Sequence, residues 1–337
     1  MPTRLVIDTD IGTDVDDLWT LAMLPRLDAV ALEAVTTVYG DTDLRARMVS
    51  AVLGAMDITV PVHAGCEQPL SGRPVMWAGH EGDGVPGIAE ASYASGDAVD
   101  VLVELAAREP GTLNILAIGP LTNIATAIAR DPAFRTNVGR LFIMGGEFKS
   151  DWPEHNFRCD AVATEAVLRS GMDITIMPFD QTIRVLIDQA DVARIALAHP
   201  LGALMAEHAH TFWTWLAGVA PNIPRNISAA HDPAALLTLV QPHLFTVTPM
   251  AMQFDVDEVF EGRLRGTPDP TSSIQVVTDL DPDAVRSAFL KALGCPDSFT
   301  DYRGAFAGDG PTTDALRQSE RDAEATAESA KARRVGW

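Results

Sequence analysis

The chain has 337 residues, of which 47% are hydrophobic and 21% charged, and its formal net charge is -21. This composition is too apolar for a disordered chain and excludes collagen-like and coiled-coil proteins, so it predicts a globular protein with a full core. The acidic excess argues against nucleic acid and anionic membranes as partners. The chain start shows no signal-peptide pattern, and no run approaches the ~20 apolar residues that a membrane span needs. We therefore expect a cytoplasmic protein.

Short apolar runs alternate with stretches of helical period through the first half of the chain. The strand-like runs are Arg4–Asp8, Val30–Val38, Leu113–Ile118, Arg140–Met144 and Asp173–Met177. The helical stretches are Asp17–Leu24, Leu44–Met56, Ala98–Arg108, Leu121–Arg130 and Ala161–Arg169. The runs are nearly continuous, which is typical of strands buried on both faces. This alternation predicts a Rossmann-like α/β fold, with a mostly parallel sheet flanked by helices.

The pattern is looser in the second half. It predicts helices at Asp188–His199, Leu201–Leu216 and from about Pro233, a connector at Ala220–Asn226, and strands at Ala251–Val256 and Ser273–Thr278. No linker divides the chain, so we expect a single domain over residues 1–313 followed by a charged tail, 314–337, to which we assign no chemistry. The three cysteines are far apart and odd in number, which favours reduced thiols.

Five carboxylates lie within ten residues at the end of the first predicted strand. They are Asp8, Asp10, Asp14, Asp16 and Asp17. Open α/β sheets bind their ligands at this edge. Helix capping explains any one of these residues, but five like charges raise each other's pKa unless a cation neutralises them. A hard divalent ion such as Ca²⁺, which takes six to eight oxygen ligands in irregular geometry, is the natural partner.

Two other aspartate motifs do not fit. An EF-hand loop needs flanking helices and a glutamate at its twelfth position, where this chain has a preceding strand and Trp19. The haloacid-dehalogenase phosphatase pattern needs Thr or Val two residues after the second aspartate, where Gly12 stands. Neither motif therefore accounts for the cluster.

A second motif, His231-Asp232-Pro233, precedes an apolar helical run. Capping by Asp232 and a proline at the first helical position explain two of its residues, but not His231. With this motif included, the sequence resembles the inosine-uridine-preferring nucleoside hydrolase family over roughly residues 4–280. The blocks that carry the resemblance are Asp8–Gly12 with Asp16–Leu18, Val35–Gly40, Ile118–Asn123, Phe142–Gly146, Glu154–Phe157 with Asp160, Phe179–Thr182 and His231–Pro233.

The resemblance implies a Ca²⁺ site that grips the ribose of a nucleoside substrate. The ligands it implies are Asp10, Asp17, Asp232 and the main-chain carbonyl of Ile118. It also makes Asp10 the base that takes a proton from metal-bound water. Cleavage of the N-glycosidic bond passes through an oxocarbenium-like state of the sugar, and carboxylates stabilise its positive charge.

The same resemblance assigns the remaining substrate contacts. Asp16, Glu154 and Asn156 match residues that hold the sugar, and His231 matches a group near the base that acts in part of the family as leaving-group acid. An imidazole is suited to that role because it titrates near neutral pH. The family is commonly dimeric or tetrameric, so we expect a homo-oligomer.

Several residues depart from the family pattern. Asp14 belongs to a two-residue insertion, which leaves the ligand assignment uncertain by one position, and Asp41 stands where the family has a ribose-contacting Asn. The loop from Gly146 to Asn156 is shorter than usual. His80 matches a mobile-loop histidine, although a solvated glycine-rich loop explains it equally well.

The aromatic residues Phe212, Trp213 and Trp215 are candidates for stacking on a base, but their helical spacing is more typical of core. The purine-specific branch has Trp where this chain has His231, which favours the branch that accepts several bases.

Three functions are compatible with these observations. The leading hypothesis is Ca²⁺-dependent hydrolysis of ribonucleosides to free base and ribose. A non-catalytic nucleoside- or ribose-binding protein is the second, because Asp41 and the short loop alter the site. The third is hydrolysis of another N-riboside, such as nicotinamide riboside. Nucleotides are disfavoured because no basic or glycine-rich phosphate cradle accompanies the site.

Overall fold

The computed structural model describes residues 2–220, 226–256 and 262–295. Most of the predicted connector, residues 221–225, and the whole predicted tail, 314–337, lie outside these ranges. None of the helices in the described part is long and apolar enough to cross a membrane.

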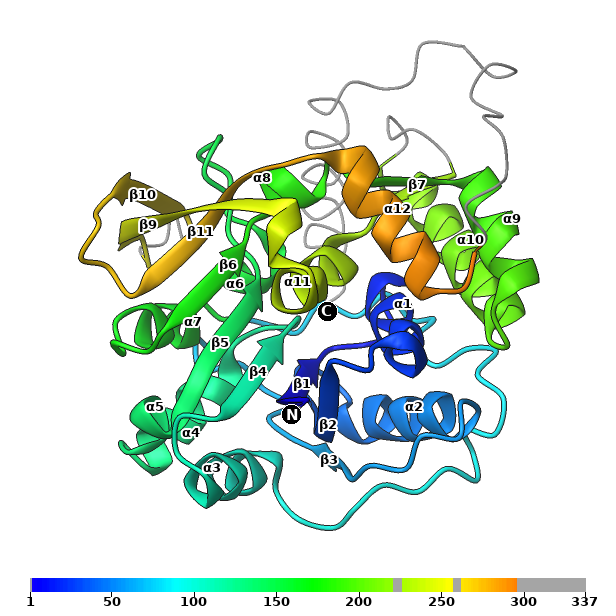
Figure 1. Cartoon of the computed structure of the whole chain (residues 1–337). Helices are drawn as coiled ribbons and strands as arrows, with labels where there is room; N and C mark the ends of the chain where they lie inside the picture. Colours follow the sequence, from blue (N-terminus) through cyan, green and yellow to red (C-terminus); the bar gives the residue numbers. More distant parts are fainter. Residues whose placement is uncertain (1, 221–225, 257–261, 296–337) are drawn as a thin grey trace, which may run out of the picture.

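A central sheet of nine strands runs through the described residues, in the order β10-β9-β11-β6-β5-β4-β1-β2-β3 (Figure 1). Its strands are β1 (Thr3–Thr9), β2 (Val30–Thr37), β3 (Val62–Ala64), β4 (Leu113–Ala117), β5 (Val138–Met144), β6 (Ile174–Met177), β9 (Phe245–Phe254), β10 (Leu264–Pro268) and β11 (Ile274–Leu280). Neighbouring strands pair in parallel, except that β9 is antiparallel to both β10 and β11. The mostly parallel α/β fold predicted from the sequence is therefore confirmed.

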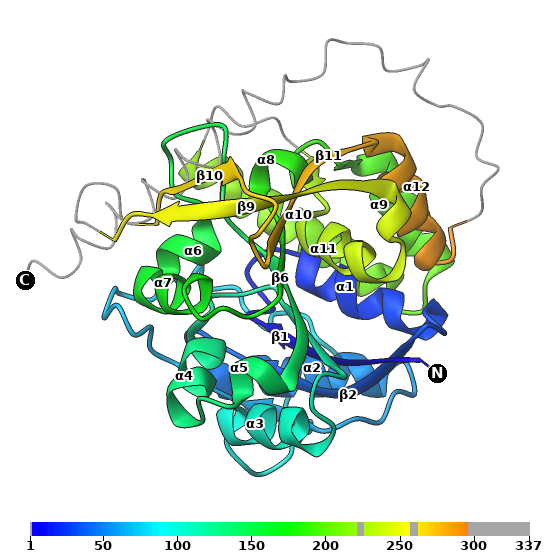
Figure 2. The same ribbon diagram turned by 60° about the vertical axis from the view of Figure 1, so that its left-hand side comes forward.

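Helices cover both faces of the sheet (Figures 1 and 2). Their bounds are α1 (Asp16–Met23), α2 (Thr42–Gly54), α3 (Ala98–Arg108), α4 (Thr122–Arg130), α5 (Phe134–Asn137), α6 (His155–Cys159), α7 (Ala161–Leu168), α8 (Phe179–Thr182), α9 (Gln189–Ala198), α10 (Gly202–Val219), α11 (His231–Val240) and α12 (Pro282–Ala292). A two-stranded sheet, β7 (Leu186–Asp188) with β8 (Ile227–Ala229), lies beside α9 and α10. Short 3₁₀ turns follow α1 and α11.

The sheet separates two hydrophobic cores. Leu5 and Ile7 of β1 pack with α1, α2, α11 and α12 on one face, whereas Val6 between them packs with α3, α4 and α7 on the other. Successive side chains of a strand point to opposite faces, so a strand covered on both sides needs apolar residues at every position. This is why the strand-like runs of the sequence are continuous rather than alternating.

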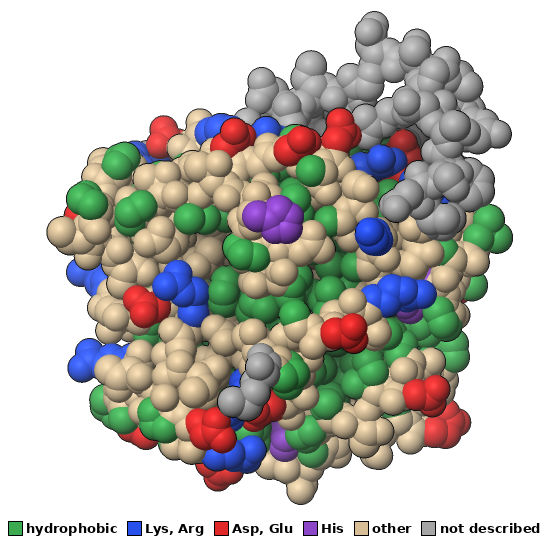
Figure 3. Space-filling view, in the orientation of Figure 1, with side chains coloured by type: hydrophobic (Ala, Val, Ile, Leu, Met, Phe, Trp, Pro, Cys, Tyr) green, Lys and Arg blue, Asp and Glu red, His purple; other side chains and the backbone are tan. Residues whose placement is uncertain are grey.

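Several elements were not predicted. The strands β3, β7 and β8 are three residues long, too short to show a period, and β10 contains Gly266 and Pro268, residues that argue against a strand. Helix α12 had a usable signal, since Asp281 caps it and Pro282 occupies its first turn. On the face drawn in Figure 3, acidic and basic side chains are interspersed, so the acidic excess forms no single patch there.

Candidate active site

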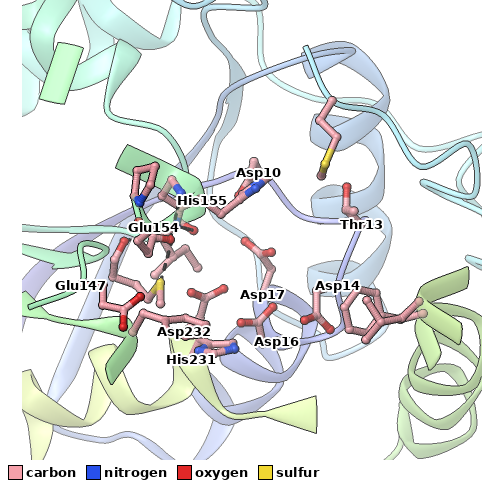
Figure 4. A pocket seen from close by; sticks show the side chains of 18 of the residues that line it. Asp10, Thr13, Asp14, Asp16, Asp17, Glu147, Glu154, His155, His231 and Asp232 are labelled. Atoms are coloured by element: carbon pink, nitrogen blue, oxygen red, sulfur yellow. Dashed lines mark hydrogen bonds between the residues drawn. The ribbon is translucent and has the colours of Figure 1, made fainter. Parts of the chain in front are cut away.

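A pocket opens at the carboxyl ends of the central strands, where β1, β4 and β5 give way to loops and helices (Figure 4). It is lined by Asp10, Thr13, Asp14, Asp16, Asp17, Met76, Ile118, Met144, Glu147, Trp152, Pro153, Glu154, His155, Asn156, Phe179, Phe212, Trp215, Leu216, His231 and Asp232. Eight of the ten predicted site residues are in this set, and Asp41 and His80 are not. The edge of the sheet predicted to bind a ligand is therefore the edge that carries the pocket.

Three buried carboxylates meet at the bottom of this pocket. One oxygen from each of Asp16, Asp17 and Asp232 lies within 4.8 Å of the other two. Asp16 and Asp17 are the first two residues of α1, and Asp232 is the second residue of α11. The prediction that Asp232 caps its helix was wrong, because α11 begins at His231. All three aspartates lie in first helical turns, where the helix dipole favours negative charge.

The three carboxylates destabilise one another when they are ionised together. Burial raises the pKa of Asp17 well above its ordinary value, and the neighbouring carboxylates of Asp10 and Asp16 raise it further. Burial likewise raises the pKa of Asp232, with Asp16 and Asp17 adding to the effect. Buried like charges of this kind need either protons or a cation.

Asp10 lines the same pocket but stands outside the group of three oxygens that lie within 4.8 Å. Burial raises its pKa, while the positive charges of Arg45 and His155 act in the opposite direction. The carbonyl of Ile118, the fourth predicted ligand, accepts a hydrogen bond of 3.2 Å from Nδ2 of Asn156. A carbonyl oxygen has a second lone pair, so this bond leaves Ile118 able to bind another group.

Thr13 and Asp14, which lie in the segment that carries the two-residue insertion, also line the pocket, and the carboxylate of Asp14 is close enough to raise the pKa of Asp232. An Asp14 carboxylate oxygen accepts the backbone N–H of Val15 at 2.5 Å. The insertion therefore adds a fourth carboxylate next to the three without displacing Asp16 or Asp17 from the first turn of α1.

Glu154 and Asn156 hold the opposite side of the pocket. Glu154 caps α6: one oxygen accepts from the N–H of Asn156 at 2.8 Å, and the other accepts from Gly146 at 3.0 Å and Phe157 at 3.1 Å. Asn156 is anchored in turn, since its amide donates to the carbonyls of Ile118 and Met144, both at 3.2 Å. Both side chains thus have fixed orientations at the pocket wall.

His231 faces the pocket from the start of α11. Its Nδ1 lies 2.6 Å from the hydroxyl of Thr182, and that hydroxyl also lies 3.1 Å from the carbonyl of Phe179. If Thr182 donates to the carbonyl, Nδ1 of His231 must donate to Thr182, so Nε2 carries a proton only when the ring is an imidazolium. The ring is stacked on Phe179, with centroids 5.4 Å apart. The imidazole is therefore held at Nδ1 by Thr182 and on one face by Phe179.

Two predicted site residues have other roles. Asp41 is exposed and caps α2, accepting the N–H of Leu44 at 2.8 Å. His80 lies behind the lining residues: its Nε2 is 2.8 Å from the carbonyl of Thr13, and its ring meets Trp215 edge-on at 6.0 Å. The structure thus gives Asp41 a capping contact and places His80 next to residues of the pocket rather than in it.

The aromatic residues of α10 divide between the two predicted roles. Phe212 and Trp215 line the pocket and are stacked on each other at 5.9 Å. Trp213 belongs to the core, where its Nε1 donates to the hydroxyl of Ser228 at 2.9 Å.

Sequence reasoning missed two charged lining residues. Glu147 follows the glycine pair at the end of β5, and His155 lies between Glu154 and Asn156. Both positions follow from signals that were available: an acidic residue at the carboxyl end of a strand, and a histidine inside a recognised motif.

Comparison with known proteins identifies this arrangement. The model of the inosine-uridine preferring nucleoside hydrolase family matches residues 5–287. The chain belongs to this family. It is 28% identical over 274 residues to a probable uridine nucleosidase 1 of Oryza sativa subsp. japonica, covering 77% of this chain and 83% of the relative. It is 30% identical over 260 residues to uridine nucleosidase 1 of Arabidopsis thaliana, covering 72% and 75%.

Solved structures share the fold. A purine-preferring ribonucleoside hydrolase from Gardnerella vaginalis superposes with a TM-score of 0.77 at 24% identity, covering 87% of this chain and 98% of that one. A plant nucleoside hydrolase gives a TM-score of 0.78, also at 24% identity, covering 88% and 100%. As a member of the nucleoside hydrolase family, the chain is a hydrolase that acts on N-glycosyl compounds.

Proposed function

We propose that this nucleoside hydrolase cleaves ribonucleosides to free base and ribose in a reaction that depends on Ca²⁺. The observation that carries the proposal is the buried group of Asp16, Asp17 and Asp232, whose oxygens lie within 4.8 Å of one another. Asp17 and Asp232 belong both to this group and to the ligand set that the family resemblance implies. They are therefore the two residues on which the metal site depends most.

The donor chemistry fits a hard divalent cation. The lining residues of the described pocket include neither Lys nor Arg, so among them only His155 and His231 can offset the charge of the carboxylates. All donors are oxygens, and their arrangement along two helix starts is irregular, as Ca²⁺ tolerates better than Mg²⁺. Asp10 and the carbonyl of Ile118 would complete the set from the β1 and β4 side. A bound ion of this kind would supply a lowered water pKa and a grip on the ribose hydroxyls.

The residues of the chain would divide the chemistry between two sides of the sugar. Asp10 takes a proton from the attacking water, and Asp16 and Asn156 hold the ribose hydroxyls. The surrounding carboxylates stabilise the positive charge that develops on the sugar ring as the bond to the base lengthens. On the other side, His231 in its imidazolium form donates the proton of Nε2 to the departing base and becomes a neutral imidazole.

The substrates that we propose first are uridine and inosine. The relatives include uridine nucleosidases and an inosine-uridine preferring nucleoside hydrolase from Crithidia fasciculata, which is 26% identical over 274 residues. The base would stack against Phe212 and Trp215, a surface without a donor set matched to one base. Acceptance of more than one base follows from such a surface.

The test is release of reducing sugar from uridine, inosine, adenosine, guanosine, cytidine and nicotinamide riboside, each with and without a strong Ca²⁺ chelator. We expect release from uridine or inosine that stops in the chelator and returns with added Ca²⁺. Release that persists after chelation contradicts the metal dependence. Tight nucleoside binding without release supports the binding-protein alternative, and release from nicotinamide riboside alone supports the other N-riboside.

A further inference from the structure

An arginine is buried directly beneath the loop that carries the aspartates. The side chain of Arg45, on α2, is 1% exposed. Its Nε donates to the carbonyl of Tyr39 at 2.7 Å, and its Nη1 donates to the carbonyls of Ile11, at 2.5 Å, and of Asp10. One guanidinium thus connects the β2–α2 loop with the backbone of the loop that leads from Asp10 to α1.

A third segment covers this guanidinium. The ring of Trp77 lies over it, with 4.9 Å from Cζ of Arg45 to the ring centroid. The same ring lies against Gly40, where a Cβ atom would be 2.6 Å from a ring carbon. The hydroxyl of Tyr39 accepts the N–H of Met76 at 2.8 Å, which holds this segment in place. Met76 itself lines the pocket.

The chemistry of this contact is specific to arginine. Burying a cation is costly unless its hydrogen bonds are made, and here they go to main-chain carbonyls rather than to a carboxylate. A planar guanidinium can donate in three directions and stack on an indole at the same time, whereas a lysine ammonium cannot do both. The charge also lies close enough to the pocket to lower the pKa of Asp10 and Asp17 against the effect of burial.

We propose that Arg45 is a positioning residue: it fixes the backbone at Asp10 and Ile11 so that the carboxylates of residues 10–17 converge on the metal site, and Trp77 keeps water from the guanidinium. This role rests on the proposed function, because the convergent carboxylates matter only if they bind an ion and a sugar. If Arg45 acted only through its charge, its removal would strengthen Ca²⁺ binding, because a nearby positive charge weakens the binding of a cation. If it positions the loop, its removal weakens Ca²⁺ binding.

The first measurement is hydrogen exchange on the metal-free protein, comparing Arg45→Lys and Arg45→Met with the wild type. We expect the amides of residues 10–17 to exchange about tenfold faster in both variants, because the carbonyls that fix the loop lose their donor. The control is Arg47→Met, which removes a half-buried arginine two residues along the same helix and leaves exchange in the loop unchanged.

The second measurement is calorimetric titration of the same proteins with Ca²⁺ alone. We expect Ca²⁺ affinity to fall about tenfold or more in both Arg45 variants, the usual effect of losing a residue that orients metal ligands. A role in stability alone would lower the melting temperature and leave the affinity of the folded protein unchanged. If Arg45→Met fails to fold, Trp77→Leu, which keeps the charge and removes its cover, gives the same comparison.

Three results would overturn the inference: unchanged exchange of residues 10–17 in both Arg45 variants, unchanged Ca²⁺ affinity of both folded variants, or tighter Ca²⁺ binding by Arg45→Met. A wild-type protein that binds no Ca²⁺ would instead contradict the proposed metal site. The exchange measurement does not need the ion, so it decides the role of Arg45 in either case.

Discussion

The two sides of the pocket are built on different principles. The carboxylate floor, formed by Asp16, Asp17 and Asp232, is buried and stands on the first turns of α1 and α11 beside the central sheet. The aromatic wall, formed by Phe179, Phe212 and Trp215, is half-buried and belongs to α8 and α10. In the proposed mode of binding, the floor would face the ribose, which every nucleoside shares, and the wall would face the base, which differs. Changes in the floor should therefore abolish catalysis, whereas changes in the wall should alter substrate choice.

The largest effect is expected next to the floor. Asp10→Asn should lower kcat on uridine more than ~10²-fold, the scale for losing a positioned base. Asp41→Asn is the matched control, because Asp41 is an exposed aspartate that caps α2 and lies outside the pocket lining. Initial rates at saturating Ca²⁺ measure both. A near-native rate for Asp10→Asn would exclude it as the base.

His231 lies between the floor and the wall. Its substitution tests protonation of the leaving group separately from the chemistry at the sugar. His231→Ala should lower the rate on inosine about 10²-fold, because the departing base needs a proton. The same variant should be nearly as active as the wild type on p-nitrophenyl riboside, whose leaving group departs without one. Equal losses on the two substrates would show that His231 positions the substrate rather than protonating it.

The carboxylates of the floor should also make the stability of the protein depend on pH and on the metal. Burial raises the pKa of Asp232 in the folded protein above its unfolded value, so the folded state holds the proton more tightly. Stability in chelator should therefore fall as pH rises from about 4, the ordinary pKa of an aspartate, towards the raised pKa of the folded protein. The fall is up to about 1.4 kcal/mol per pH unit for one group. Asp232→Asn should accordingly be more stable than the wild type in chelator at pH 7, and this difference should disappear near pH 4, which is about the ordinary pKa of an aspartate.

Urea unfolding with and without Ca²⁺ measures this effect. Added Ca²⁺ should reverse the order at pH 7, because it stabilises only the protein that keeps Asp232. The comparison is made against the variant because His199 and His208, whose pKa values burial lowers, titrate equally in both proteins. A variant less stable than the wild type in chelator at pH 7 would refute the strain attributed to the floor.

The smallest effect is expected from the wall. Trp215→Ala should raise KM for inosine about fivefold, since an aromatic stack contributes about 0.5–1.5 kcal/mol. It should leave kcat and inhibition by free ribose nearly unchanged. The matched comparison is Trp213→Ala, which should lower the melting temperature because Trp213 is core. A kcat loss in Trp215→Ala like that of Asp10→Asn would remove the distinction between the two sides.

The sequence predicted the regular parts of the fold well. Periodicity placed α3 at its observed bounds and β1 within one residue at each end, because both elements bury a repeating set of side chains. The meeting of Asp17 with Asp232 was expected from the family resemblance, since residues so far apart in the chain carry no local signal of contact.

The sequence did not predict the hydrogen-bond partners of the polar side chains. Asp41 and Glu154 match the family positions for sugar contacts, yet both accept backbone N–H groups at helix starts. Arg45 was overlooked because an arginine on an amphipathic helix ordinarily belongs to its solvated face. Hydrogen-bond partners depend on how loops fold over one another, and neither spacing nor composition records that.

The three hydrogen bonds of Glu154 bear on how relatives of this protein are sorted. Because its oxygens join Gly146, just after β5, to the start of α6, selection for a folded chain should preserve this glutamate even where turnover has been lost. Its presence in a related sequence is therefore a marker of ancestry and not of an active enzyme. The opposite holds for Asp16, Asp17 and Asp232. Together they destabilise the metal-free protein, so a lineage that loses the reaction should gain stability by replacing them.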